Sequence, residues 1–176
     1  MAAITAQMVK ELRDRTGAGF KEAKDILTQT DGNMDEAIKA LKAKGLADAG
    51  KKQHREAREG RIEVYVHAGS RMAAMVELNC ETDFVARTDD FIALSKEIAL
   101  HIAATKPLYI RPEDVPADVL AASDLSPEEY YKENVLLSQA YVRNASETIN
   151  DKIQGAIARL GENIVVRRFV RYEVGA

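Results

Sequence analysis

The chain has 176 residues and a formal net charge of −3, a length that allows one mid-sized domain or a small domain joined to a larger one. Hydrophobic residues make up 46% and charged residues 30%, an ordinary globular balance that argues against disorder, and a pI near 5.7 argues against a dedicated nucleic-acid binder. A single cysteine, Cys80, excludes an internal disulfide, and no run approaches the roughly 20 apolar residues of a membrane-spanning helix.

The start of the chain carries no visible targeting signal. The run Met1–Thr5 lacks the charged segment and the apolar stretch that a secretory signal requires. We therefore expect a cytoplasmic protein without a membrane partner.

Apolar residues in the first 45 positions recur at helical spacing in three short stretches. Thr5 is placed to cap the first helix, and Gly17 interrupts the pattern after it. Asn33 is placed to cap the third helix, and Gly45 stands where a helix end favours a positive φ angle. Three such helices bury only a modest core, so we expect a small module over residues 1–45.

The next segments change in character twice. Residues 46–59 keep helical propensity but carry mostly charged side chains, which predicts a solvated linker helix. From Ile62 to Val66 and from Ala74 to Cys80, apolar and other residues alternate with a period of two. Because a glycine-containing turn separates the two runs, they predict a β-hairpin at the start of a core domain over residues 60–176.

The remainder of the core reads as helices followed by a closing strand. Helical spacing predicts three helices, which begin near Phe91, Pro127 and Ile149, whereas Pro112 to Pro127 is irregular and acidic. Alternation returns from Ile164 to Tyr172 and predicts the last strand. The order β-β-α-α-α-β predicts an α+β core with about three antiparallel strands and helices packed on one face.

The connection that follows the hairpin fits its surroundings poorly. Connections are usually polar, yet this one carries Phe84 and Val85 among charged residues. One interpretation is that Phe84 folds back over the hairpin, since aromatic side chains are usually buried. The other is that Asp83 and Phe84 form a projecting tip that inserts into a partner, because an aromatic anchor beside a charge is typical of interface hot spots.

No pattern typical of catalysis or cofactor binding stands out. His54, His67 and His101 lie too far apart in sequence for a metal site, and Gly17-Ala18-Gly19 lacks the rest of a phosphate-binding loop. Cys80 ends a strand and is expected to be a small buried apolar residue. We therefore expect no catalytic residues, no cofactor and no metal.

Four blocks of sequence resemble the elongation factor Ts family and keep that family's order along the chain. They are Arg13–Gly19, Arg55–Gly60, Glu77–Arg87 and Gly161–Phe169. The resemblance implies that the first module folds like a ubiquitin-associated domain. It also implies a guanine-nucleotide exchange factor that binds elongation factor Tu with GDP and promotes the exchange of GDP for GTP.

The resemblance also implies which residues contact elongation factor Tu. The turn that disturbs the partner's magnesium site corresponds to Thr82, Asp83, Phe84 and Val85. The contact of the N-terminal module corresponds to Gly17, Gly19 and Phe20. The chain departs from the family in two places: it has Phe20-Lys21 where a methionine pair is common, and only Pro112 to Pro127 where longer members carry a further subdomain or helical hairpin.

Other classes of function stay open at this point. A plain binding module would recognise proteins through its N-terminal helices without any effect on a nucleotide. An RNA-binding protein would use Lys51, Lys52, Arg55 and Arg58 of the linker, and its affinity would fall steeply with salt. An enzyme would need a catalytic constellation that the sequence does not provide.

A homodimer built on the core is the expected assembly. The resemblance implies this, because family members with one core subdomain use a second copy in place of the missing one. The closing strand supports this, because Val165, Phe169 and Val174 fall partly on the face opposite Ile164, Val166, Val170 and Tyr172, so that apolar residues occur on both faces. One layer of helices covers only one face, so we expect a second copy on the other and two bound copies of elongation factor Tu. The alternative is a monomer with scattered apolar residues on its surface.

Overall fold

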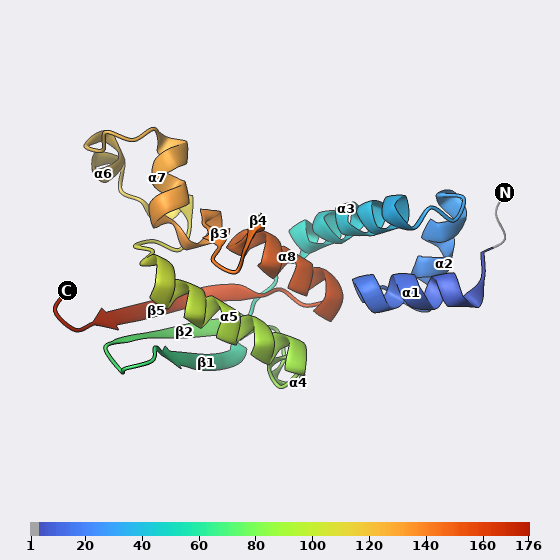
Figure 1. Ribbon diagram of the computed structural model, residues 1–176, viewed down its shortest axis with the longest axis horizontal. Helices are drawn as coiled ribbons and strands as arrows, with labels where there is room; N and C mark the ends of the chain where they lie inside the picture. The colour runs from blue at the N-terminus through green and yellow to red at the C-terminus, as the bar shows by residue number, and fades with distance from the viewer. Residues whose placement is uncertain (1–3) are drawn as a thin grey trace.

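The computed structural model describes residues 4–176. The expectation about a targeting signal rests partly on Met1–Ala3, which lie outside the described residues. Helices and strands alternate irregularly along the chain, which confirms the predicted α+β class (Figure 1). In order, the elements are α1 (Ala6–Thr16), α2 (Phe20–Gln29), α3 (Met34–Lys52), β1 (Glu59–Val66), β2 (Met72–Cys80), α4 (Asp83–Ala86), α5 (Asp89–Thr105), the 3₁₀ turn η1 (Pro112–Asp114), α6 (Ala117–Ala121), α7 (Pro127–Asn134), the 3₁₀ turn η2 (Leu136–Ser138), β3 (Ala140–Tyr141), β4 (Asn144–Thr148), α8 (Ile149–Leu160) and β5 (Val165–Glu173).

The first three helices form a module with its own hydrophobic cluster, as predicted. The Thr5 hydroxyl accepts a hydrogen bond from the Met8 N–H and caps α1, and Gly17 ends that helix with φ +72°. Asn33 caps α3 by accepting from two main-chain N–H groups. The cluster at the centre consists of Val9, Leu12, Ala23, Ile26, Leu27, Ala37 and Leu41. The likeness of this module to ubiquitin-associated domains stays a prediction.

The third helix does not end at Gly45, and the prediction of a separate linker helix over residues 46–59 is wrong. Instead α3 continues without a break to Lys52, and residues 53–58 are not helical. Gly45 serves close packing rather than a turn, because a Cβ atom at this position would lie 2.9 Å from the Cβ of Ala158 in α8. One helix therefore runs from the module onto the core, as Figure 1 shows.

The core is built on a three-stranded antiparallel sheet with the order β1-β2-β5, and it confirms the predicted hairpin and closing strand. Figure 1 shows α5 and α8 on one face of this sheet. Inward side chains of β2 pack beneath these helices, and Cys80 among them is fully buried, as predicted. The largest completely buried side chains of this core are Phe91, Leu78, Ile98, Ile102, Leu136, Ile149 and Ile157.

The other face of the sheet is open and carries apolar residues. Ile62, Val64 and Val66 of β1 are each more than half exposed, as is Tyr172 of β5. A β-bulge changes which side chains of β5 face the core. Glu77 pairs with Arg168, but the next residue, Leu78, pairs with Val166, so one residue of β5 is left unpaired. This unpaired residue reverses the alternation of the later side chains between the two faces of the sheet. Phe169 consequently packs against the core, whereas Val170 and Tyr172 share the open face with Met75 and Ala73.

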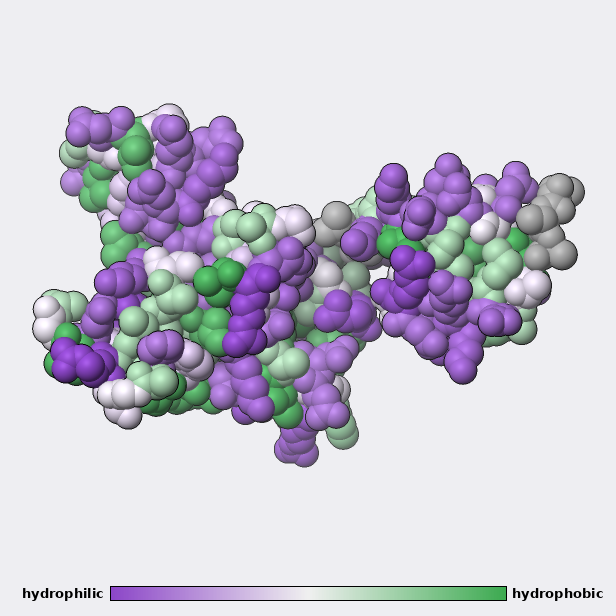
Figure 2. All heavy atoms as spheres, in the orientation of Figure 1, coloured by the Kyte–Doolittle hydropathy of each residue, from purple (hydrophilic) through white to green (hydrophobic). Residues whose placement is uncertain are grey.

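A short arm, residues 107–135, projects from the core and ends in α6 and α7 (Figure 1). The sequence predicts an irregular segment from Pro112 to Pro127, but the structure contains η1 and α6 there. Acidic residues predominate in the arm: Glu113, Asp114, Asp118, Asp124, Glu128, Glu129 and Glu133 accompany only Arg111 and Lys132. Polar residues cover much of this arm and of the N-terminal module on the face seen in Figure 2. None of the helices between residues 4 and 176 has the length and apolar character needed to span a membrane.

A buried polar network joins α5 to the segment that precedes α8. The His101 ring is fully buried, and its Nδ1 accepts a hydrogen bond from the Val142 N–H at 3.2 Å. Its Nε2 therefore carries the hydrogen and donates to the Gln139 side-chain oxygen at 3.0 Å, which also accepts from the Thr105 hydroxyl. Burial lowers the pKa of His101 and keeps the ring neutral.

This network predicts a loss of stability in mild acid. In the unfolded chain a histidine titrates near pH 6.5, above the lowered pKa of folded His101, so acid protonates the unfolded chain first. The stabilisation that depends on neutral His101 is complete above about pH 6.5. As the pH falls through the folded pKa, the free energy of unfolding should decline by up to about 1.4 kcal/mol per pH unit. Urea unfolding at several pH values measures this slope. The slope should shrink in His101→Asn and persist in His54→Asn, which removes an exposed histidine.

Candidate partner-binding site

The connection after β2 forms a projecting tip, and it is built on the single helical turn α4. The Thr82 hydroxyl accepts from the Val85 N–H and caps this turn. Ala86 is buried and Val85 is half-buried against the core, so these two residues anchor the turn. Phe84 points the other way and is 77% exposed. The interpretation that Phe84 folds back over the hairpin is therefore wrong.

Asp83 lies beside Phe84 at the start of the turn. Its carboxylate pairs with the Arg87 guanidinium at 2.8 Å; the Arg87 side chain is largely exposed and that of Asp83 is half-exposed. The tip thus presents an unburied aromatic ring next to a charged pair. An exposed apolar anchor of this kind gains free energy only when a partner covers it.

A residue that is distant in sequence holds the tip in place. Glu162, in the loop between α8 and β5, accepts from the Glu81 N–H at 3.0 Å and the Thr82 N–H at 2.9 Å. Its second oxygen accepts from the Thr82 hydroxyl at 2.6 Å. The only sequence signal at Glu162 is the block Gly161–Phe169, which resembles the family's closing strand. A long-range contact across 80 residues has no local pattern that could have revealed it.

Cys80 secures the inner side of the same turn. Its thiol donates to the Thr82 carbonyl oxygen at 3.1 Å. Burial, with a smaller contribution from the nearby Glu162 carboxylate, raises the pKa of the Cys80 thiol to about 11. The thiol consequently stays protonated and unreactive at neutral pH, which fits a structural role.

The second predicted contact lies on the N-terminal module, between α1 and α2. Phe20 begins α2 and is 56% exposed, and Gly19 before it lies in open space. Gly17 instead faces the core, since a Cβ atom there would lie 3.1 Å from Cδ of Arg159 in α8. The structure therefore brings this loop against α8 and leaves Phe20 free to contact another molecule.

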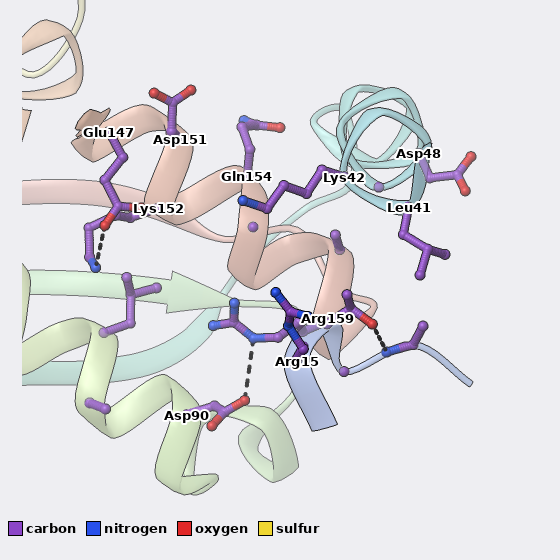
Figure 3. A pocket seen from close by; sticks show the side chains of 18 of the residues that line it. Arg15, Leu41, Lys42, Asp48, Asp90, Glu147, Asp151, Lys152, Gln154 and Arg159 are labelled. Atoms are coloured by element: carbon purple, nitrogen blue, oxygen red, sulfur yellow. Dashed lines mark hydrogen bonds and ion pairs between the residues drawn. The ribbon is translucent and has the colours of Figure 1, made fainter. Parts of the chain in front are cut away.

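A cleft of about 860 Å³ separates the module from the core (Figure 3). Arg15 and Lys42 line it from the module side, and Asp90, Lys152 and Arg159 line it from the core. Core charges are paired with one another: Lys152 bonds two glutamates, and the Arg159 guanidinium lies 3.6 Å from Asp90. The walls present both signs of charge, so the cleft does not indicate a cationic or an anionic ligand. Among residues 4–176, no group of three or more His, Cys, Asp or Glu side chains is arranged to hold a metal ion.

Comparison with known proteins gives a consistent result. The family described as Elongation factor TS matches residues 2–125. A protein named Elongation factor Ts from Herpetosiphon aurantiacus is 50% identical in an alignment that covers 98% of each chain. Proteins of the same name from Heliobacterium modesticaldum and Carboxydothermus hydrogenoformans are 47% and 45% identical, with 98% of this chain and 90% and 89% of theirs covered. On both comparisons, the chain belongs to the elongation factor Ts family.

Proposed function

We propose that this protein is a guanine-nucleotide exchange factor of translation elongation, which binds elongation factor Tu with GDP and promotes the exchange of GDP for GTP. It acts by binding in the cytoplasm and forms or breaks no covalent bond, so it is not an enzyme in the usual sense. The observation that carries the proposal is the exposed Phe84 beside Asp83 on an anchored turn, in a chain of the elongation factor Ts family.

In this mechanism the tip enters the GTP-binding domain of elongation factor Tu. Phe84 occupies an apolar site there, and Asp83 disturbs the magnesium ion that bridges the phosphates of GDP. Since exchange factor and nucleotide must weaken each other by the same factor, each tenfold loss of GDP affinity requires about 1.4 kcal/mol of differential binding. Burying Phe84 supplies roughly 1.5–3 kcal/mol, or one to two powers of ten. The rest of the interface supplies the remainder.

Release of a fluorescent GDP analogue from elongation factor Tu tests this function. Addition of the protein should accelerate release in a concentration-dependent way that reaches a plateau. A plain binding module would form a complex without accelerating release, and an RNA-binding protein would show neither effect. Either of these two results would refute the exchange function.

The N-terminal module provides a second contact with the same GTP-binding domain in this proposal. Phe20 is its exposed anchor, and Gly17 and Gly19 shape the loop that presents it. Phe20→Ala should weaken binding of elongation factor Tu about tenfold, because roughly 1.5 kcal/mol of apolar burial is lost. The half-saturating concentration in the release assay measures this effect. The plateau rate should change little, and a normal half-saturating concentration would remove Phe20 from the interface.

We also propose that the protein is a homodimer in which two open sheet faces pack against each other, with one elongation factor Tu bound per copy. The open face supports this, because it gathers Ile62, Val64, Val66, Met75 and Tyr172, all of them exposed apolar residues. A hollow of about 290 Å³ beside them is flanked by the Arg168–Glu77 ion pair. Exposed apolar patches of this kind are typical of protein–protein interfaces.

Light scattering at micromolar concentration tests the assembly. The parent protein should have twice the mass of one chain. Val64→Asp should yield monomers, because a pair of dimer-related carboxylates would be desolvated at the interface. Leu108→Asp alters an apolar residue that is 63% exposed on the arm and should remain dimeric. A parent protein that stays monomeric with elongation factor Tu present would contradict the dimer but not the exchange function.

A further inference from the structure

Three segments that are distant in sequence meet behind the tip. Besides the bonds of Glu162, the Asn163 N–H donates to the Glu81 carboxylate at 2.7 Å. The Asn163 side chain donates to the carbonyl oxygens of Gln53 at 3.3 Å and Arg55 at 2.7 Å. These two carbonyls lie in the segment that connects α3 to β1. The loop between α8 and β5 therefore holds both the tip and the connection to the N-terminal module.

We infer that Glu162 is a positioning residue of the proposed exchange site. Its carboxylate fixes Glu81 and Thr82 so that Phe84 projects in the orientation the partner requires, and this inference rests on the proposed function. Asn163, the next residue, fixes the connection from α3 to the same loop. Through these two neighbours the spacing between the module's Phe20 contact and the tip is set before a partner binds.

The local structure of the tip explains why such a residue is needed. A single helical turn is too short to be stable by itself, because nucleation of a helix is unfavourable. Phe84 is exposed and makes no packing contribution that could order the turn in the free protein. Order has to come from contacts outside the turn: Val85 and Ala86 pack against the core, and hydrogen bonds to the ionised Glu162 carboxylate, among the strongest available, fix its start.

The geometry of Glu162 predicts an order among its substitutions. Two main-chain N–H groups reach one oxygen and the Thr82 hydroxyl reaches the other, so the site needs acceptors at both oxygens. Glu162→Gln retains one acceptor oxygen for the two N–H groups and should rescue part of the function. Glu162→Asp is one methylene shorter and should behave like Glu162→Ala. Ordering even one residue costs about a factor of ten, so we expect Glu162→Ala to slow GDP release about tenfold.

A double-mutant cycle with Phe84→Ala distinguishes positioning from a general loss of stability. If Glu162 acts through Phe84, then Glu162→Ala should slow release in the parent protein but have little further effect in Phe84→Ala. Amide hydrogen exchange of Glu81 and Thr82 in the free protein should accelerate in Glu162→Ala, while amides of β2 stay protected. Glu128→Ala is the matched control, because Glu128 is an exposed glutamate of α7 that bonds Lys132. It should change neither the rate of GDP release nor the hydrogen exchange of these amides.

Each outcome decides the inference. Additive effects of the two substitutions, or normal release by Glu162→Ala beside slow release by Phe84→Ala, would overturn it. A release rate that changes only because less protein is folded would overturn it as well. If Phe84→Ala itself leaves release unchanged, the proposed function of the tip fails, and hydrogen exchange in the free protein still tests the positioning. Unaltered exchange of the Glu81 and Thr82 amides in Glu162→Ala would then rule it out.

Discussion

Phe84→Ala is expected to slow the release of GDP from elongation factor Tu by about ten- to a hundredfold, the equivalent of the roughly 1.5–3 kcal/mol gained when a phenylalanine is buried. The free energy of unfolding should stay within about 0.5 kcal/mol of the parent value, since the side chain is 77% exposed in the free protein. Stopped-flow release of a fluorescent GDP analogue and urea unfolding measure the two effects separately.

Leu108→Ala is a suitable control, because Leu108 is a comparably exposed apolar residue on the arm. It should leave both release and stability unchanged. Asp83→Ala should also slow release without loss of stability, since its ion pair with Arg87 is largely exposed and contributes little to folding. If Phe84→Ala instead lowers the melting temperature and leaves release per folded molecule unchanged, the assignment of the tip is wrong.

Gly60→Ala is expected to destabilise the core by about 3–5 kcal/mol, a large part of the 5–15 kcal/mol that is typical of a whole domain. Gly60 lies in β1 with φ +150°, a conformation that residues with a side chain rarely adopt. A Cβ atom there would lie 2.2 Å from the carbonyl oxygen of Leu78 and 2.7 Å from Cα of Asn79. Both are backbone atoms of the paired strand, so neither can move aside without breaking the hairpin.

Urea unfolding of Gly60→Ala and Gly50→Ala tests this prediction. Gly50 lies in α3 with open space around its Cα, so alanine there should stabilise the protein by up to about 1 kcal/mol through better helix propensity. The two substitutions add the same methyl group, and only the one in β1 meets another backbone. A stability of Gly60→Ala within about 1 kcal/mol of the parent protein would contradict the close approach of the two strands.

Local sequence patterns were sufficient for most of the fold. Caps at Thr5 and Asn33 and the glycine at position 17 mark real helix ends, because each satisfies main-chain groups of its own helix. Gly45 gives the same signal in the sequence, but its role is to admit a neighbouring helix that is 113 residues away. A glycine needed for a turn and one needed for close packing look identical in sequence.

The open sheet face and the anchoring of the tip depend on tertiary structure. Alternation along β1 separates two faces but does not say which one the helices cover, and the apolar set Ile62, Val64 and Val66 lies on the uncovered face. The bulge in β5 depends on pairing with β2, so it has no signature in β5 alone. For the tip, the residues Thr82 to Val85 were recognisable by resemblance, whereas Glu162 becomes visible only when the loop after α8 is seen beside them.

The unbroken course of α3 has a consequence for the way the protein unfolds. Leu41 of this helix belongs to the hydrophobic cluster of the N-terminal module, and Ala49, two turns later, belongs to that of the core. A module this small gains little from its own buried surface, and much of its stability must come from sharing a helix that the core keeps folded. Heat should therefore melt both parts in one cooperative transition, so that a substitution deep in the core also melts the distant module at a lower temperature.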